Sequence, residues 1–224
     1  MRKELINRII SSIILIVIAF FFIIKGSFLF NFFILICFGI TAYEWHKMTK
    51  KKSYYIFGFI FLIISFFTVY QLRNEFYGNF NYFIMILLIC ISSDIGGYIF
   101  GKLFKGPKLT KFSPNKTYAG MLGSYLLPTI VLSFYFNNLN FLNNIGIQAT
   151  SKEISLFFFI FILLISTISQ LGDIIISYFK RLSKIKDTGK IIPGHGGILD
   201  RVDGMIFAFP FGYIVLKLNI FQYF

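Results

Sequence analysis

The sequence predicts an all-α, polytopic integral membrane protein, a helical bundle with about seven transmembrane helices. Of its 224 residues, 57% are hydrophobic and only 14% are charged, whereas soluble domains carry about 25% charged residues. The apolar residues form unbroken runs such as 9–24 and 154–168, which approach the ~20 residues that cross a bilayer as a helix. These runs lack the 3.6-residue periodicity of helices that keep one face in water, which argues against a soluble amphipathic bundle.

The apolar runs give seven candidate spans, separated by short polar segments. They lie at residues 9–24, 28–44, 56–72, 80–96, 118–136, 154–174 and 205–220. The first run follows a basic start but no small-residue cleavage site, so we expect a retained helix rather than a signal peptide. No repeat of 20–50 residues and no low-complexity linker divides the chain. We therefore expect one membrane domain over 1–224, with N-terminal spans in 1–93 and the polar motifs in 94–224.

The basic residues predict the orientation of the bundle. With the N-terminus in the cytoplasm, the inner segments 1–8, 45–55, 97–117 and 175–204 carry three, four, five and six Lys or Arg, 18 of the chain's 22. This asymmetry follows the positive-inside rule and predicts an inner-membrane protein whose polar motifs face the cytoplasm. The net charge of +13 then reflects topology and attraction to anionic lipids. No stacking-rich soluble module suggests nucleic-acid binding.

Polar residues gather in two of the inner segments, each of which starts with an aspartate at the end of a span. An ionisable side chain costs about 2.5–3.5 kcal/mol at the centre of a transmembrane helix and commonly marks a functional site. Asp94 and Asp173 are therefore candidates. In the first segment the other candidates for substrate contact are Tyr98, Lys102, Ser113, Lys116 and Thr117. The last three precede the fifth span, so we also expect this group to cap that helix.

The second segment combines carboxylates and cations at helical spacings. If the sixth span continues inward as a helix, one stripe carries polar residues at i, i+4, i+7 and i+8, namely Asp173, Ser177, Lys180 and Arg181. Asp200 and Asp203 share a face if Asp200 begins the last helix. Carboxylates beside strong cations suit a magnesium–phosphate site, because Mg²⁺ is usually held by one or two carboxylates plus substrate phosphates.

A glycine-rich turn, Pro193-Gly-His-Gly-Gly197, precedes the last two aspartates. Glycines let backbone N–H groups approach an anion closely, so we expect His195, Gly196 and Gly197 to contact substrate. The turn is not a P-loop, because the GxxxxGK[ST] order is absent. Outside both segments, Glu44 and Trp45 at the inner end of the second span are expected to anchor that helix at the membrane interface.

The second segment as a whole resembles the signature of the phosphatidate cytidylyltransferase (CDP-diacylglycerol synthase) family. The residues that carry the resemblance are Ser177-x-x-Lys180-Arg181, Lys186-Asp187-x-Gly189 and Pro193-Gly-His-Gly-Gly-Ile-Leu-Asp-Arg-Val-Asp203. The match covers 27 residues, and the elements at Asp94 and at 113–117 resemble the family in the expected order. Ala119 departs from the family, which commonly has an acidic residue there, and the N-terminus is shorter than in many members.

The resemblance implies an enzyme, a nucleotidyltransferase that converts CTP and phosphatidate to CDP-diacylglycerol and pyrophosphate in phospholipid biosynthesis. For the mechanism, the residues themselves lead us to expect metal-assisted in-line attack on the CTP α-phosphate, with one or two Mg²⁺ held by Asp173, Asp200 and Asp203. The implied catalytic residues are Asp173, Lys180, Arg181, Lys186, Asp187, Asp200, Arg201 and Asp203. The implied substrate-binding residues are Asp94, Tyr98, Lys102, Ser113, Lys116, Thr117, Ser177, His195, Gly196 and Gly197. The expected partners are CTP, phosphatidate and membrane lipids; a homodimer is compatible with the sequence.

Two other functions are alternatives to phosphatidate cytidylyl transfer. The nearer one is a CTP-dependent kinase or nucleotidyltransferase that acts on another lipid, such as a polyprenol, and a kinase would release CDP in place of pyrophosphate. The more distant one is a transporter, which would carry its carboxylates near mid-span and show related halves. The aspartates here lie at the inner ends of spans and no inverted repeat is evident, which disfavours transport.

Overall fold

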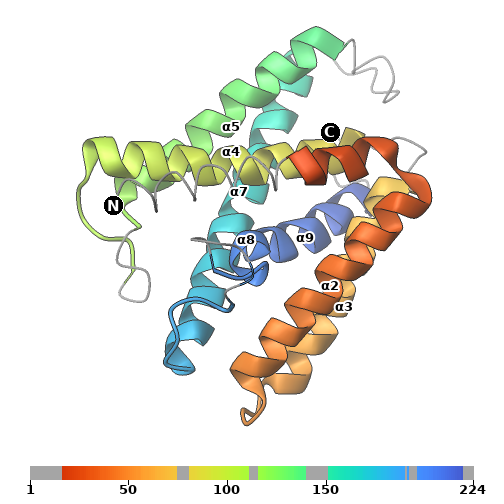
Figure 1. Ribbon diagram of the computed structural model, residues 1–224. Coiled ribbons are helices and arrows are strands. Elements are labelled where there is room, and N and C mark those ends of the chain that lie inside the picture. Colours follow the sequence, from red (N-terminus) through yellow and green to blue (C-terminus); the bar gives the residue numbers. More distant parts are fainter. Residues whose placement is uncertain are drawn as a thin grey trace. The chain divides into compact units, whose positions relative to one another are not determined.

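The computed structural model describes residues 17–74, 81–110, 116–139, 151–189, 191 and 196–218, in which helices are joined by turns and loops (Figure 1). The helices are α2 (Ser27–Thr49), α3 (Tyr55–Asn74), α4 (Asn81–Phe104), α5 (Tyr118–Leu139), α7 (Ser151–Leu182), α8 (Leu199–Val202) and α9 (Met205–Lys217). Residues 17–25 are helical as well. Within these described ranges there is no β-strand, only an isolated bridge between Lys108 and Thr117.

Five of these helices are long and apolar enough to cross a membrane. They are Phe28–Thr49, Tyr55–Asn74, Asn81–Phe104, Tyr118–Tyr135 and Phe158–Leu182. Each coincides with a predicted span, so the all-helical membrane class is confirmed. The first predicted span lies partly outside the described residues, and the last corresponds to the 13-residue helix α9, so the number seven stays a prediction.

Helices α4 and α7 extend well beyond the predicted ends of their spans. Helix α4 continues for ten residues after Asp94, and α7 continues to Leu182. The predicted continuation of the sixth span is therefore confirmed, and its four polar residues share one helix. Helix α7 ends in a Schellman motif, in which Ile185 N–H donates to Lys180 O and Lys184, at φ 56°, donates to Arg181 O.

The chain divides into two compact units, and the division falls inside α7. One unit comprises Met1–Phe80 and Ile176–Asp203, and the other comprises Asn81–Ile175 and Gly204–Phe224. In the first unit α2 packs against α3 and α8, and in the second α4 packs against α5 and α9. The prediction of a single membrane domain stays a prediction.

Aromatic packing joins the α2–α3 hairpin to the end of α7 in the first unit. The ring of Trp45 lies 5.5 Å from that of Phe179, and its indole N–H donates to Tyr55 O at 3.0 Å. Just after α7, the Ser183 hydroxyl donates to Met48 O at 3.0 Å. These contacts place the cationic end of α7 beside the polar end of α2.

Small residues bring α4 and α5 together in the second unit. A Cβ atom added to Gly96 would overlap the carbonyl oxygen of Gly123, and one added to Gly120 would lie 2.7 Å from the oxygen of Gly97. Glycines at such positions allow helix backbones to touch, as is common where helices pack in a membrane. The contact holds the end of α4 beside the start of α5, where the first polar segment lies.

Candidate active site

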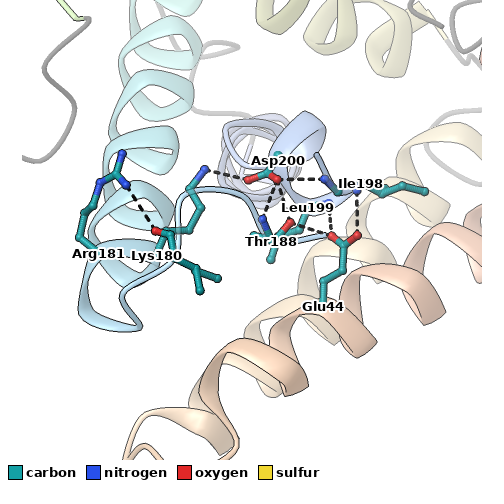
Figure 2. A network of polar contacts seen from close by, with 9 residues as sticks. Glu44, Lys180, Arg181, Thr188, Ile198, Leu199 and Asp200 are labelled. Carbon is teal, nitrogen blue, oxygen red and sulfur yellow. Dashed lines mark hydrogen bonds and ion pairs between the residues drawn. The ribbon is translucent and has the colours of Figure 1, made fainter. Parts of the chain in front are cut away.

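The second polar segment forms a partly buried ion pair between α7 and α8. Lys180 Nζ lies 2.8 Å from Asp200 Oδ1, and the two side chains are 11% and 6% exposed (Figure 2). The two residues are 20 positions apart in the sequence, so the chain after α7 turns back and brings α8 into contact with the end of α7. The structure thus brings together a predicted carboxylate and a predicted cation of the site.

The second carboxylate oxygen of Asp200 accepts hydrogen bonds from the loop. Its donors are Thr188 N–H at 2.8 Å, the Thr188 hydroxyl at 3.0 Å and Gly197 N–H at 3.0 Å. Burial raises the pKa of Asp200, but the hydrogen bonds and charge of Lys180, together with the backbone donors, outweigh burial and hold that pKa below its ordinary value. Asp200 is therefore an ionised, oriented carboxylate.

A second buried carboxylate, Glu44 of α2, faces the same loop (Figure 2). It is 1% exposed. It accepts hydrogen bonds from the Thr188 hydroxyl at 2.9 Å, Ile198 N–H at 3.1 Å and Leu199 N–H at 2.8 Å. The prediction that Glu44 and Trp45 anchor α2 at the membrane interface was wrong, because Trp45 is also buried, at 3% exposed, and both side chains pack inside the unit.

The glycines of this region make room for the two carboxylates. A Cβ atom on Gly189 or Gly197 would collide with the Glu44 carboxylate. Gly196 has φ +87°, and a Cβ atom there would lie 2.6 Å from Asp200 Oδ2. The N–H of Gly197 donates a hydrogen bond to the Asp200 carboxylate. In the structure this N–H is therefore occupied by a side chain of the protein itself. Substrate contacts of Gly196 and Gly197 stay predictions, and His195 lies outside the described residues.

The other signature residues surround this pair with different degrees of exposure. Arg181 is exposed and donates to Ile185 O at 3.4 Å (Figure 2), which supports the turn after α7. Lys186, Asp187 and Arg201 are exposed, whereas Ser177 is buried. Asp203 is the C-cap of α8 with helical dihedral angles, so the expected i, i+3 relation to Asp200 holds locally.

The first polar segment has its own ion pair, which lies in the second unit. Lys116 pairs with Asp173 of α7, and its ammonium also lies 3.4 Å from Gln170 O. Thr117 Oγ1 accepts a hydrogen bond from Gly120 N–H at 3.1 Å, which confirms the predicted cap of the fifth span. Ser113 lies outside the described residues. Since Asp173 and Asp200 belong to different units, their convergence on one metal stays a prediction.

Three further candidates lie along one exposed stripe of α4. Asp94, Tyr98 and Lys102 follow one another at four-residue intervals, which align on a helix. The Lys102 ammonium lies 5.6 Å from the centre of the Tyr98 ring and 3.5 Å from its hydroxyl. The stripe therefore offers a carboxylate, an aromatic ring and a cation in one row.

Comparison with known proteins gives the family. A sequence model of the cytidylyltransferase family matches residues 50–219. A phosphatidate cytidylyltransferase of Rickettsia bellii is 34% identical over 228 residues, covering 96% of this chain and 91% of the relative. One of Rickettsia typhi is 33% identical, covering 98% of this chain and 94% of the relative. One of Staphylococcus aureus is 37% identical over 158 residues, 68% of this chain and 54% of the relative.

The chain belongs to the cytidylyltransferase family. The family expected from the second polar segment is thereby confirmed, and the chain is an enzyme, a nucleotidyltransferase. Its long apolar helices make it a membrane protein. The matched residues of this cytidylyltransferase include both ion pairs, but they begin after Glu44.

Glu44 and Thr188 are the site residues that sequence reasoning missed. The rule applied to Asp94 and Asp173, that a carboxylate at a span is costly and marks a function, also covered Glu44. The chain has only nine acidic residues, which made each of them informative. Thr188 occupies a variable position of the family signature, between Asp187 and Gly189, and no sequence pattern distinguished it.

Proposed function

We propose that this cytidylyltransferase transfers the cytidylyl group of CTP to phosphatidate, giving CDP-diacylglycerol and pyrophosphate in phospholipid biosynthesis. The observation that carries the proposal is the 34% identity, over 96% of the chain, to a relative named phosphatidate cytidylyltransferase. The ion pair of Lys180 and Asp200 supports it, because both residues belong to the signature and lie in contact.

The reaction requires little acid–base catalysis. A phosphate oxygen of phosphatidate attacks the α-phosphorus of CTP, a new P–O bond forms, and the bond to the β-phosphate breaks as pyrophosphate leaves. The attacking oxygen is already an anion, so no base has to remove a proton. The residues of the site therefore act by positioning the two substrates and by balancing negative charge.

The donor set fits magnesium. Among the described residues no three His, Cys, Asp or Glu side chains cluster as metal ligands. Mg²⁺ does not require such a cluster, because one or two carboxylates and the substrate phosphates hold it. Asp173, at 28% exposed, is accessible, and Asp200 is oriented by Lys180. We assign the metal to Asp173, Asp200 and Asp203; when bound, Mg²⁺ would neutralise charge on the phosphates and the leaving pyrophosphate.

Two lysines of the site are paired with carboxylates, and we assign both to charge balance at the substrate phosphates. Lys116 and Lys180 each hold a carboxylate in the structure. With Mg²⁺ bound, Asp173 and Asp200 would hold the metal, and the ammonium groups of Lys116 and Lys180 would balance charge on phosphate oxygens. The exposed cations Arg181, Lys186 and Arg201 are assigned to the phosphates of CTP. The stripe of Asp94, Tyr98 and Lys102 is assigned to substrate contact on α4.

The proposed location follows from the substrates. The acyl chains of phosphatidate remain in the bilayer, whereas CTP arrives from the cytoplasm, so the reaction belongs at the cytoplasmic surface of the inner membrane. The concentration of 18 basic residues in the segments expected to face inward supports this placement.

The test uses the full chain, purified and reconstituted in liposomes with labelled CTP, phosphatidate and Mg²⁺. We expect CDP-diacylglycerol and pyrophosphate in equal amounts, and we expect Lys180→Met to lower the rate on the order of 100-fold, because a preorganised charge at the reacting phosphates is lost. Lys51→Met removes an equivalent charge from an exposed turn and should leave the rate unchanged. Release of CDP with a polyprenol acceptor, and no product from phosphatidate, would establish the lipid-kinase alternative instead.

A further inference from the structure

We propose that Glu44 is a positioning residue of the active site, which holds Asp200 in place through Thr188 and the backbone N–H groups of Ile198 and Leu199. The inference rests on the proposed function and deepens it, because it assigns a role in the transfer reaction to the N-terminal helices. Glu44 lies before residue 50, where the match to the family model begins, and its role is inferred from its contacts in this chain.

The burial of Glu44 is the first argument. A buried carboxylate is costly unless hydrogen bonds replace its water, and Glu44 lies near the end of a 23-residue helix that is mostly apolar. In the described part of the chain its partners are one hydroxyl and two backbone N–H groups, with no cation among them. A side chain placed at such cost, and bonded only to the signature loop, orders that loop.

The second argument is the position of the Thr188 hydroxyl, between two carboxylates. Its oxygen lies 2.9 Å from Glu44 Oε2 and 3.0 Å from Asp200 Oδ2 (Figure 2). A hydroxyl has one proton and donates it to one acceptor at a time. The bond that Glu44 makes to this hydroxyl therefore competes with the bond that Asp200 makes, and a change at one carboxylate is transmitted to the other.

The third argument is that Glu44 fixes the start of α8. It accepts the N–H groups of Ile198 and Leu199, which directly precede Asp200. Gly189 and Gly197 leave space for the carboxylate, since a Cβ atom at either position would collide with it. Helix α8 is only four residues long. The N–H groups at its start are bonded to the Glu44 and Asp200 carboxylates, which hold its first turn in place. A misplacement of about 1 Å at a reacting group can cost 10²-fold in rate.

The experiment compares Glu44→Gln and Thr188→Val with the conservative Thr188→Ser, in liposomes. We expect kcat to fall about 10–100-fold in the first two variants, as for partners that orient a metal ligand. KM for CTP should stay near the wild-type value, because Glu44 does not touch substrate. Thr188→Ser, which keeps the hydroxyl, should retain kcat. The double variant should lose no more than the worse single variant, since both break one connection.

Two controls separate positioning from general damage to the fold. Thr41→Val removes a buried hydroxyl on the same helix whose bonds go only to Cys37 O and Phe38 O, and it should leave kcat unchanged. Trp45 is the only tryptophan of the chain and adjoins Glu44, so an unchanged emission spectrum shows that the local packing persists. If Glu44→Gln does not fold, Thr188→Val carries the test, because it keeps both backbone bonds of Glu44.

A readout without turnover separates this inference from the proposed function. Mg²⁺ should raise the Tm of the wild-type chain in detergent, and the rise should be smaller in Glu44→Gln, whereas Thr41→Val should match the wild type. If the wild type acts on another lipid, the kcat comparison is made with that acceptor, and the Glu44 assignment is judged there while the phosphatidate proposal fails. Wild-type kcat and an unchanged Mg²⁺ response in Glu44→Gln would overturn the inference, as would equal losses in Thr41→Val.

Discussion

At the scale of single residues, the site depends on two buried carboxylates that are satisfied in different ways. Asp200 has a cation and three loop donors, whereas the partners of Glu44 among the described residues are one hydroxyl and two backbone N–H groups. Burying a charge costs several kcal/mol, and removal of one partner from a buried pair commonly costs about 3–5 kcal/mol. An ion pair such as that of Lys180 and Asp200 therefore adds little net stability, and its clearer effect in the structure is to orient the carboxylate.

The lowered pKa of Asp200 predicts how stability depends on pH. A carboxyl whose pKa is lower in the folded than in the unfolded chain stabilises the fold above its unfolded pKa, and this stabilisation is lost as the pH falls through the folded pKa. We expect the Tm in Mg²⁺-free detergent to fall below about pH 4, near the ordinary pKa of aspartate. Asp200→Asn should have a lower Tm at pH 7 and a flatter acid profile. Identical acid profiles for the two chains would contradict the assignment.

At the scale of helices, α4 and α7 continue without a break from their apolar spans into the polar segments that follow. The spacing of Asp173, Ser177 and Lys180 predicted one stripe on one helix, and α7 supplies it. Likewise, the hydroxyl at Thr117 predicted the cap of α5. These features depend on neighbours within a few residues, which periodicity and capping rules describe well.

The contacts that assemble the site join residues far apart in the chain, and the sequence did not predict them. Glu44 meets Thr188 across 144 positions and Leu199 across 155. Lys116 contacts α7 at Gln170 O across 54 positions. Periodicity fixes which face of a helix is polar, but the partner of that face depends on how the helices pack, which is set by side chains on several elements together. The role of Glu44 was missed for this reason.

The packing of α4 on α5 gives a prediction about its glycines. Gly96→Ala should destabilise the fold by about 1–3 kcal/mol, the usual cost of overpacking, because the new Cβ would overlap the backbone oxygen of Gly123 and neither helix backbone can give way cheaply. Gly39→Ala is the matched control, since a Cβ there meets nothing within 4 Å. It should stabilise α2 by up to about 1 kcal/mol, because alanine favours helix.

Denaturant or thermal unfolding in detergent measures both glycine variants. Opposite signs of the change in Tm would support the close contact of α4 and α5. A Gly96→Ala chain as stable as the wild type would mean that the two helices do not touch at that glycine.

At the scale of the whole molecule, the order of apolar and basic segments follows from the way in which the chain crosses the membrane. Five long apolar helices separate the polar segments, and 18 of the 22 basic residues fall in alternate segments. An alternation of this kind follows when each helix crosses the bilayer once and basic loops stay on the cytoplasmic side. The same constraint would place both polar motif segments on the side where CTP is found.

Cysteine labelling tests this topology in a chain that lacks its two native cysteines, Cys37 and Cys90. Lys25 and Lys105 are both exposed, and they belong to segments expected on opposite sides of the membrane. In intact host cells, a membrane-impermeant maleimide should label Lys25→Cys, and it should label Lys105→Cys only after the membrane is permeabilised. The reverse pattern would place the motif segments outside, where CTP is absent, and would contradict the proposed site. Labelling of both in intact cells would mean that the three predicted spans between them do not all cross the membrane, because an even number of crossings must then separate the two positions.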